Sequence, residues 1–407
     1  MVREMKHTEI GEIPAEWKLQ TFEETFRVLS NNTLPRADLN DRRGTVRNVH
    51  YGDILTRFGE ILDCEKDEIP YLNDVSLLTA SAQVLRDGDV ILADTAEDDT
   101  VGKATEVYGL GKGRMVAGLH TIPCRVKTGA FVPKWLGYYM NSPIYHDQVL
   151  PYVTGIKVSS ISKTVISETL IAVPPPKEQK AIVLALSEVD QLLAELKKVV
   201  SKLRDFKRGC LYLMFPQEGS DIPQMREPGF TEPWQQRKLG EIAIEIIAGG
   251  DIDKNLILED GRYPVIANAF SGDGIVGYYD TEYKVKAPAV TVTGRGDVGH
   301  AKARLADFTP TVRLLSVKSH HDVFFLENAI NTLRIVIEST GVPQLTVPQL
   351  AKYELVFPQD FAEEEKVGAF FKEIDCFIAL HQQKFDKYAQ IKKAMMSELI
   401  TGKIKLV

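Results

Sequence analysis

The chain has 407 residues, of which 44% are hydrophobic and 26% charged, which is typical of an ordinary globular protein of two or three domains. The net charge of −7 argues against coating nucleic acid by bulk charge alone but is compatible with local basic surfaces. The four cysteines form no CxxC pair, and the sequence has neither an apolar leader nor a run of 18 apolar residues, so we expect a cytoplasmic protein without zinc, disulfides or a membrane span.

A tryptophan segment near the start of the chain returns in the second half. It reads IPAEWKLQTFEETF in the first half and, from Phe230, FTEPWQQRKLGEIAIEI in the second. Trp17 aligns with Trp234 and Glu24 with Glu241. A polar connector rich in Pro and Gly, PQEGSDIPQMREPG, separates the two units. The sequence therefore predicts a duplicated module with pseudo-twofold symmetry.

The long middle regions, about 30–170 and 240–355, do not resemble each other, although both are typical of mixed α/β structure with short strands. GDVILADT and APAVTVTG predict buried strands, and Trp135–Leu150 and Asn328–Thr340 predict short helices. Each region ends in a similar phrase before a long helix. Similar ends around dissimilar middles indicate a common scaffold that presents different surfaces.

Two long amphipathic segments, Pro174–Phe215 and the stretch from Pro358, are related by a constant offset of 185 that aligns Asp190 with Asp375 and Lys207 with Lys392. Apolar residues recur in steps of four and three, as in a heptad seam. Each copy predicts a helix of about 37 residues, or roughly 55 Å. We expect the copies to pair as a coiled coil; the alternative is that each helix docks on its own domain. The expected seam residues are Ile182, Leu186, Val189, Leu193, Leu196, Val200, Leu203, Val367, Phe371, Ile374, Ile378, Phe385 and Tyr388.

Gly294–Gly299 spells GxGxxG after a predicted strand, the pattern of a dinucleotide-binding loop. The following AKARLADFTPTVRLLSV predicts no clean helix, so a glycine-rich turn or a loop approaching a phosphate, with Arg295 at its tip, are the other interpretations. The sequence contains no P-loop, no GxSxG, no HExxH and no amino-methyltransferase [DNS]PP[YFW] run. We expect that this chain catalyses no reaction alone.

The polar residues that remain on predicted loops are of the types that read base edges and hold phosphates. Each of them has a scaffold or solvated role as its alternative, and His120 in particular fits a core histidine. Arg295 is the favoured single reader. The candidates are His50, Tyr51, Lys103, Arg114, His120, Lys157 and Ser159 in the first half, and Asn268, Arg295, Arg304 and Arg313 in the second.

Several phrases resemble those of the specificity subunits of type I restriction-modification enzymes: IGEIPAEW, VHYGDI, VAGLHT, PPPKEQ, VTGRGDVG and EEEKVGAFFKEIDCFIALHQQKFDKYAQIKKAMMSEL. The resemblance covers nearly the whole chain and implies an α+β fold. Two mixed α/β target-recognition domains with pseudo-twofold symmetry are then joined by two long antiparallel helices that form a coiled coil. The second helix departs from the family, because PQDFAEEEKVG lacks the EQ pair seen at Glu178-Gln179.

The resemblance also implies a division of the chain into four segments. These are residues 1–173 with the N-terminal segment and target-recognition domain 1, 174–215 with the central helix, 216–357 with the linker and target-recognition domain 2, and 358–407 with the C-terminal helix.

The function implied by the resemblance is DNA sequence specificity without catalysis. Each recognition domain would read one half of a split asymmetric site, and the helices would set the spacing and dock two modification (methyltransferase) subunits. Two restriction (motor-nuclease) subunits join in a restricting complex. No cofactor is expected in this chain; S-adenosylmethionine belongs to the modification subunits, and ATP and Mg to the restriction subunits. The alternatives are a structural coiled-coil adaptor, a stand-alone dinucleotide-dependent enzyme or an undetected nuclease.

Overall fold

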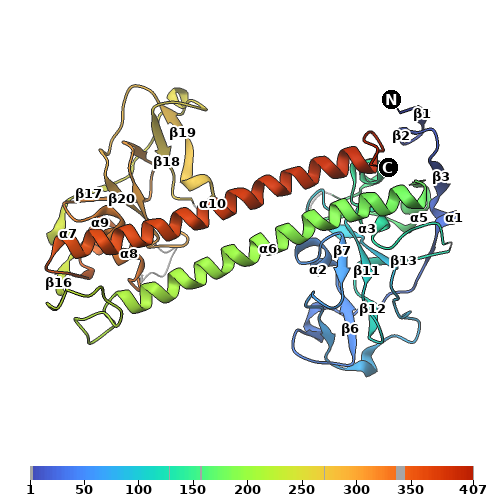
Figure 1. The fold of residues 1–407 in the computed structure, drawn as a ribbon, viewed down its shortest axis with the longest axis horizontal. Coiled ribbons are helices and arrows are strands. Elements are labelled where there is room, and N and C mark those ends of the chain that lie inside the picture. Colours follow the sequence, from blue (N-terminus) through green and yellow to red (C-terminus); the bar gives the residue numbers. More distant parts are fainter. Residues whose placement is uncertain (1–2, 128, 156–157, 270, 336–343, 407) are drawn as a thin grey trace. The chain divides into compact units, whose positions relative to one another are not determined.

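The computed structural model describes residues 3–127, 129–155, 158–269, 271–335 and 344–406. The chain forms two compact units, the first made of Met1–Glu195 with Phe385–Val407 and the second of Leu196–Lys384. Each unit contains a β-rich domain and parts of both long helices, α6 (Pro176–Met214) and α10 (Phe361–Ile400) (Figure 1). The α+β fold expected from the sequence, with two β-rich domains and two long helices packed together, is confirmed, whereas the division into four segments stays a prediction.

The first unit is organised around a five-stranded sheet with the order β4-β13-β9-β11-β7, in which only the β11–β7 pair is parallel. Its strands are β4 (Phe26–Val28), β13 (Thr121–Val126), β9 (Val90–Ala93), β11 (Ala104–Tyr108) and β7 (Ile61–Asp63). A second sheet, β12-β6-β8-β5, contains β12 (Arg114–Ala117), β6 (Val46–Val49), β8 (Tyr71–Leu72) and β5 (Leu39–Asn40).

Three strand pairs complete the β structure of the first unit: β1 (Met5–Thr8) with β2 (Gly11–Pro14), β10 (Thr95–Ala96) with β14 (Ser159–Ser160), and β3 (Lys18–Thr21) with β15 (Leu170–Val173). The β3–β15 pair joins the beginning of the domain to its end. The short helices are α1 (Phe22–Thr25), α2 (Tyr51–Thr56), α3 (Trp135–Met140), α4 (Pro143–Val149), α5 (Lys163–Ser167), η1 (Arg36–Asp38), η2 (Val75–Leu77) and η3 (Leu150–Tyr152).

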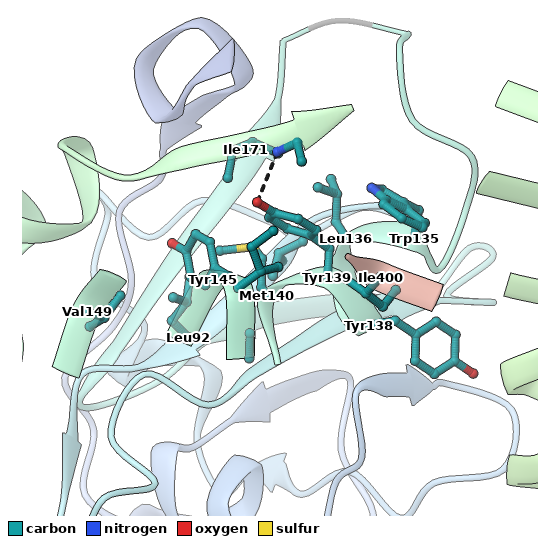
Figure 2. Close-up of a cluster of buried hydrophobic side chains, with 14 of the residues drawn as sticks. Leu92, Trp135, Leu136, Tyr138, Tyr139, Met140, Tyr145, Val149, Ile171 and Ile400 are labelled. Carbon is teal, nitrogen blue, oxygen red and sulfur yellow. Dashed lines mark hydrogen bonds between the residues drawn. The ribbon is translucent and has the colours of Figure 1, made fainter. Parts of the chain in front are cut away.

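The core of the first unit is rich in aromatic side chains. Trp135, Tyr138, Tyr139 and Tyr145 are buried, and Figure 2 shows Ile400 of α10 beside them. A buried tyrosine hydroxyl needs a polar partner. The Tyr139 hydroxyl forms two hydrogen bonds with the backbone of β15. It donates to the carbonyl oxygen of residue 170 (3.2 Å) and accepts from the N–H of residue 172 (2.9 Å). The same core therefore fastens α3 to β15 and covers the end of α10.

The second unit contains a four-stranded sheet, β17-β23-β20-β21, and a three-stranded sheet, β19-β18-β22. Their strands are β17 (Ala243–Ala248), β23 (Leu314–Ser319), β20 (Ala289–Thr293), β21 (Ala301–Arg304), β19 (Ile275–Tyr279), β18 (Tyr263–Ile266) and β22 (Thr309–Pro310). β16 (Gln235–Lys238) pairs with β24 (Glu354–Phe357), as β3 pairs with β15. The short helices are α7 (Leu239–Ile242), α8 (Val323–Asn331), α9 (Val347–Leu350), η4 (Lys254–Leu256) and η5 (Ser271–Gly274).

The two middle regions, which look unrelated in sequence, share one sheet topology. The order β17-β23-β20-β21 repeats β4-β13-β9-β11, with every pair antiparallel. The smaller sheets also correspond, because each contains one parallel pair: β12 with β6 in the first unit and β22 with β18 in the second. In the chain, β12 directly precedes β13 and β22 directly precedes β23. The common scaffold therefore extends through the middles. Their similarity escapes notice in the sequence because buried strands require apolar character rather than particular residues.

The predicted short helices differ from the observed ones at their boundaries. The stretch Trp135–Leu150 breaks into α3 and α4 because Ser142 and Pro143 begin a new helix. The stretch Asn328–Thr340 overlaps α8, which begins at Val323 because the Asp322 side chain accepts from two backbone N–H groups. Residues 336–340 of that prediction lie outside the described residues.

The long helices run antiparallel within each unit (Figure 1). In the first unit Lys392 of α10 contacts Asp190 of α6, and the last turns of α10 share a core with the first turns of α6. In the second unit Lys207 of α6 contacts Asp375 of α10. All thirteen expected seam residues are buried or half-buried. Among the described residues, no helix is long and apolar enough to cross a membrane.

Candidate nucleic-acid interface

Three of the predicted readers meet at one edge of the first unit, on the segments that follow β6 and β12, and two residues that follow β9 join them. The rings of His50 and Tyr51 lie 4.6 Å apart, and those of Tyr51 and His120 5.2 Å apart. His120 Nδ1 lies 3.2 Å from Asp94 Oδ1 and 3.3 Å from Thr95 Oγ1. We call these five residues the first rim. It brings aromatic, imidazole and carboxylate groups from distant parts of the sequence to one edge.

Local structure explains how the first rim forms. His50 follows β6 and caps α2, where its Nδ1 accepts a hydrogen bond from the backbone N–H of Gly52 (3.2 Å). Burial lowers the pKa of His50, which favours the neutral ring that this acceptor role requires. His120 lies on the turn between β12 and β13 and is exposed. The exposed imidazole ring of His120 is therefore accessible to a ligand, whereas the buried ring of His50 mainly supports Tyr51.

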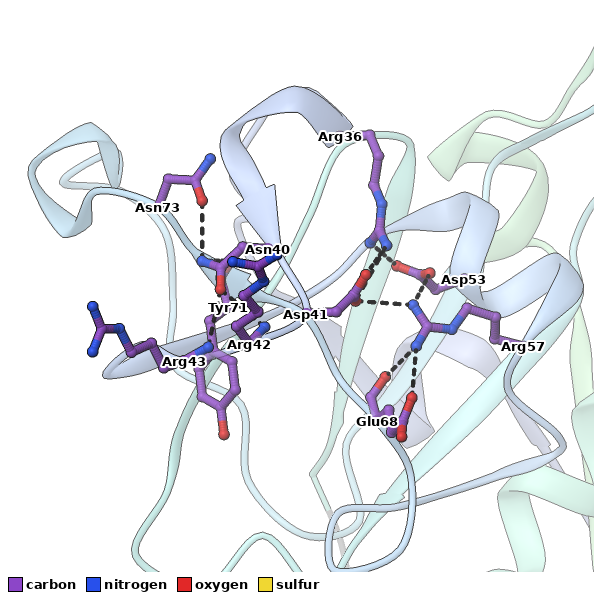
Figure 3. Close-up of polar contacts among 10 residues, drawn as sticks. All are labelled: Arg36, Asn40, Asp41, Arg42, Arg43, Asp53, Arg57, Glu68, Tyr71 and Asn73. Carbon is purple, nitrogen blue, oxygen red and sulfur yellow. Dashed lines mark hydrogen bonds and ion pairs between the residues drawn. The ribbon is translucent and has the colours of Figure 1, made fainter.

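An ion-pair network fixes α2, the helix that begins at the rim residue Tyr51 (Figure 3). The buried Asp53 carboxylate receives Arg36 (2.9 Å) and Arg57 (3.2 Å), and Arg57 also contacts Asp41 (3.2 Å). Figure 3 shows the Arg43 side chain extending away from this network. Arg36 and Arg57 thus orient the helix that carries Tyr51.

The second unit presents the predicted readers Asn268, Arg295 and Arg313 in a corresponding cluster. Asn268 Oδ1 accepts from the backbone N–H groups of Gly294 (2.8 Å) and Arg295 (3.3 Å), and its Nδ2 donates to the Arg295 carbonyl (2.8 Å). We call these four residues the second rim. The GxGxxG loop joins the antiparallel strands β20 and β21 instead of opening a helix, so it is a hairpin turn and not a dinucleotide loop.

The two rims occupy equivalent positions on the shared scaffold. Gly118 N–H donates to the Val49 carbonyl as Thr311 N–H donates to that of Ile266, both at 2.8 Å. Two residues further on, the backbone carbonyl of His120 accepts from the backbone N–H of Asp94 (3.1 Å), and that of Arg313 accepts from the backbone N–H of Gly294 (2.9 Å).

These bonds make His120 equivalent to Arg313. Both adopt the left-handed conformation, with φ of 54° and 74°, which is uncommon outside glycine. The same backbone therefore displays a different side chain in each unit.

The structure places the other candidates in several environments. Ser159 of β14 lies beside the first rim, because β14 pairs with Thr95 and Ala96. Lys103 is half-buried and donates to the backbone carbonyls of Leu55 (3.1 Å) and Phe58 (2.9 Å), which is a scaffold role. The remaining three are Arg114, exposed at the start of β12 away from the rim; Arg304, half-buried on β21; and Lys157, which lies outside the described residues.

Two rim residues were missed in the sequence. Asp94 and Thr95 end the predicted strand GDVILADT, and the polar turn was the available signal. Their proximity to His120 depends on the pairing of β9 with β13, which sequence spacing does not reveal.

A buried pattern at the start of each long helix is also repeated. In the first unit Glu178 Oε2 accepts from Trp17 Nε1 (2.9 Å) and contacts Arg3, and in the second Glu363 accepts from Trp234 Nε1 (3.2 Å) and pairs with Arg226 (2.6 Å). The aligned tryptophan segments thus fasten the helix starts.

The departure from the EQ pair has a structural compensation. Gln179 accepts from the backbone N–H of Val132 (2.9 Å), and the aligned Glu364 accepts from that of Asp322 (3.3 Å). The buried Glu364 carboxylate also lies 2.8 Å from His321 Nδ1. In the second unit, His321 therefore pairs with the carboxyl group that stands where the first unit has the amide of Gln179.

Within the described residues, no group of three or more His, Cys, Asp and Glu side chains could hold a metal ion. The groups that the rims present can donate and accept hydrogen bonds and stack on flat rings. Two halves with one scaffold and different exposed rims, each bound to the paired helices, define the class as a duplicated recognition protein.

Comparison with known proteins shows what this chain is similar to. Residues 231–390 match the family model described as type I restriction modification DNA specificity domain. The chain is 22% identical to a putative type I restriction enzyme MjaX specificity subunit of Methanocaldococcus jannaschii, over 98% of this chain and 96% of the relative. A putative type I specificity subunit of Mycoplasma pneumoniae is 22% identical over 58% of this chain and 63% of its own. Residues 231–390 thus match a type I restriction modification DNA specificity domain, and the chain is similar to type I specificity subunits over almost its whole length.

Solved structures share the fold. The S subunit of a type I restriction-modification system from M. genitalium superposes with a TM-score of 0.60 at 14% identity, covering 98% of this chain and 99% of that one. A chain from a structural study of assembly and conformational transition of the type I R-M system gives a TM-score of 0.53 at 18% identity, covering 96% and 99%.

Proposed function

We propose that this chain is the specificity subunit of a type I restriction-modification complex. It reads a split, asymmetric DNA sequence, one half through the first rim and the other through the second. The observation that carries the proposal is the equivalence of His120 and Arg313. Two copies of one scaffold with different side chains at the same exposed turn are suited to two half-sites that differ in sequence.

The chemistry of each rim indicates what it would contact. An arginine side chain can donate two hydrogen bonds to O6 and N7 of guanine in the major groove, so Arg295 and Arg313 favour a guanine in the second half-site. At the first rim, Asp94 can accept from an exocyclic amine such as N4 of cytosine. Tyr51 and His120 present a mixed aromatic and polar surface beside that carboxylate.

The paired helices are proposed to set the spacing of the half-sites and to dock two methyltransferase subunits. At 39 residues, α6 is about 59 Å long, which exceeds the ~34–36 Å of one turn of B-DNA. Its exposed apolar side chains Leu184 and Phe206, together with Phe377 and Leu380 of α10, support a docking role because single helices in water rarely expose so many.

Partner subunits would supply the chemistry. S-adenosylmethionine would bind to the modification subunits, and ATP and Mg to two restriction subunits where the complex also cleaves DNA. This chain would then contribute the choice of sequence.

Co-expression with the methyltransferase from the neighbouring reading frame, followed by methylome sequencing of the host DNA, tests the proposal. We expect adenine methylation at one split asymmetric motif. A stable complex that adds no methylation would contradict the assignment. Mixing the purified chain with DNA and magnesium is the companion control, because cleavage without partners would indicate an enzyme.

A further inference from the structure

A small polar cavity lies beside the second rim, on one face of the sheet formed by β20 and β21. Its volume is about 80 Å³, and its polar lining consists of Asp273, Thr291, Thr293, His300, Lys302 and Arg304. Ala267 and Ala269, which flank the rim residue Asn268, complete part of the wall. The cavity therefore adjoins the loop that holds Arg295.

Arg304 is the least satisfied group in this lining. It is half-buried, and burial lowers its pKa. Its Nε donates to Thr291 Oγ1 (3.0 Å), which is the guanidinium's sole hydrogen-bond partner among the residues that the structure describes. A guanidinium carries five N–H donors, so most of its donor capacity is available to a ligand in the cavity.

Two other half-buried arginines in this chain meet a carboxylate. Arg125 Nε and one terminal nitrogen bind Asp89 at 2.8 and 2.6 Å, and Arg226 binds Glu363 in the same two-pronged way at 2.6 and 2.8 Å. Arg304 faces a hydroxyl where those arginines face an anion. The terminal nitrogens of Arg304 therefore remain able to bind an external oxyanion.

The charges around the cavity favour an anion. Lys302 and Arg304 supply two positive charges to the lining, and Asp273, which pairs with Lys302, supplies one negative charge. Glu327 also lies near Arg304, but it is not among the residues that line the cavity; it accepts from the backbone N–H of Ala303, and burial raises its pKa. His300 also lies on the cavity wall, and burial lowers its pKa, which favours the neutral ring.

The scaffold does not require polarity at two of these positions, because the first unit is apolar there. Strand register places Ile91 of β9 where the second unit has Thr291, and Val107 of β11 where it has Arg304. Ile91 and Val107 are fully buried in a hydrophobic cluster. The polar cavity is thus a property of the second unit that the stability of the sheet does not explain.

We propose that this cavity is an oxyanion site for a phosphate group, and that its ligand is a phosphodiester of the DNA backbone next to the base that the second rim reads. The choice of DNA as the source of the phosphate rests on the proposed function. Arg304 then fixes the register of the second rim on the duplex, while Arg295 and Arg313 read base edges.

The test compares the wild-type chain with R304Q, K302Q and R237Q, each assembled with its methyltransferase subunits. R237Q removes an exposed arginine on β16, outside both the cavity and the rim. Affinities for cognate and unrelated duplexes are measured at several salt concentrations. R304Q is expected to weaken both affinities by the same factor, roughly tenfold, and to reduce the slope of log K against log salt by about one, while the methylated motif stays the same. K302Q should act in the same direction, and R237Q should match wild type.

Three other results would each overturn part of the proposal. Wild-type affinity and salt slope in R304Q and K302Q would exclude a phosphate contact. Relaxation at one base position would make Arg304 a base reader. If titration with inorganic phosphate shows binding that R304Q abolishes, yet the DNA salt slope is unchanged, the oxyanion site stands and its assignment to DNA falls. A wild-type complex without sequence-selective binding would instead refute the proposed function, which separates the two failures.

Discussion

Lys392 Nζ of α10 lies 2.7 Å from Asp190 Oδ1 of α6, and the aligned residues exchange roles in the second unit, where Lys207 of α6 lies 2.7 Å from Asp375 of α10. These lysines occupy the positions where the heptad pattern lacks its next apolar residue. In the first unit the ammonium also contacts Glu60 at 2.5 Å. The interruption of the seam is therefore a repeated ion pair between the two helices.

Replacing Lys392 with methionine should destabilise the first unit strongly. The lysine side chain is only 12% exposed, so its loss leaves the carboxylates of Asp190 and Glu60 close together without a cation. Breaking a buried pair in this way costs about 3 kcal/mol. Urea denaturation measures the change, and K207M is the matched control with a smaller expected loss, because Asp375 is 38% exposed. Equal losses in the two variants would contradict the importance of burial.

Glu106 should make stability depend on pH. Its carboxylate caps the start of α3 at Gly137 N–H (2.9 Å), and burial raises its pKa to about 7. Between the unfolded-state pKa of 4.5 and about 7, the folded chain holds a proton that the unfolded chain has released. The stabilisation by that proton is complete below the unfolded-state value and is lost as pH rises through about 7.

The free energy of unfolding should thus fall by up to about 3 kcal/mol from this group between about pH 4.5 and pH 7.5. E106Q should show a flatter profile over the same range. Parallel profiles for E106Q and wild type, measured in urea at several pH values, would rule out Glu106 as the cause.

The pair formed by His321 and Glu364 should behave as a coupled unit. H321A leaves a buried carboxylate without its partner and should destabilise the second unit by about 3 kcal/mol. E364Q restores the neutral amide that the first unit has at Gln179. The double variant should therefore be more stable than H321A alone. A double-mutant cycle with a coupling energy near zero would mean that the two side chains act independently.

Glycine variants of the rim turns separate side-chain reading from backbone strain. H120G and R313G remove the side chains at positions where glycine adopts the observed φ without the penalty of about 1 kcal/mol that other residues incur. Both variants should fold with stability near wild type. In the methylome, each should relax discrimination by about 1–3 kcal/mol at a position in a different half of the motif. Relaxation of both variants in the same half would oppose the assignment of one rim to each half-site.

Arg295 should act in the second half-site alone. R295A removes the guanidinium but keeps the backbone N–H that Asn268 holds, so the loop should retain its shape. We expect weaker DNA binding and relaxation at one base position of that half. Unchanged discrimination at every position of the motif would contradict its role as a reader.

The repeated helices and their seam were predictable because heptad spacing and a fixed offset are visible in the letters. The contact of His50 and Tyr51 with His120 was not predictable, because it depends on which strands are neighbours in the sheets. Lys103 illustrates the opposite limit. Its sequence context suggests a basic loop, yet the long side chain reaches two backbone carbonyls and supports the fold. Asp94 was overlooked because only the strand pairing brings it to His120.

The pairing of β3 with β15, and of β16 with β24, has an evolutionary consequence. The chain enters and leaves each β-rich domain along two adjacent, hydrogen-bonded strands. Lys18 lies opposite Val173 in the first unit, and Gln235 lies opposite Phe357 in the second. Insertions and deletions in the intervening loops can be absorbed there without shifting where the following helix begins. Selection can then lengthen, shorten or replace a recognition loop in one half while the helices and the other half keep their own history.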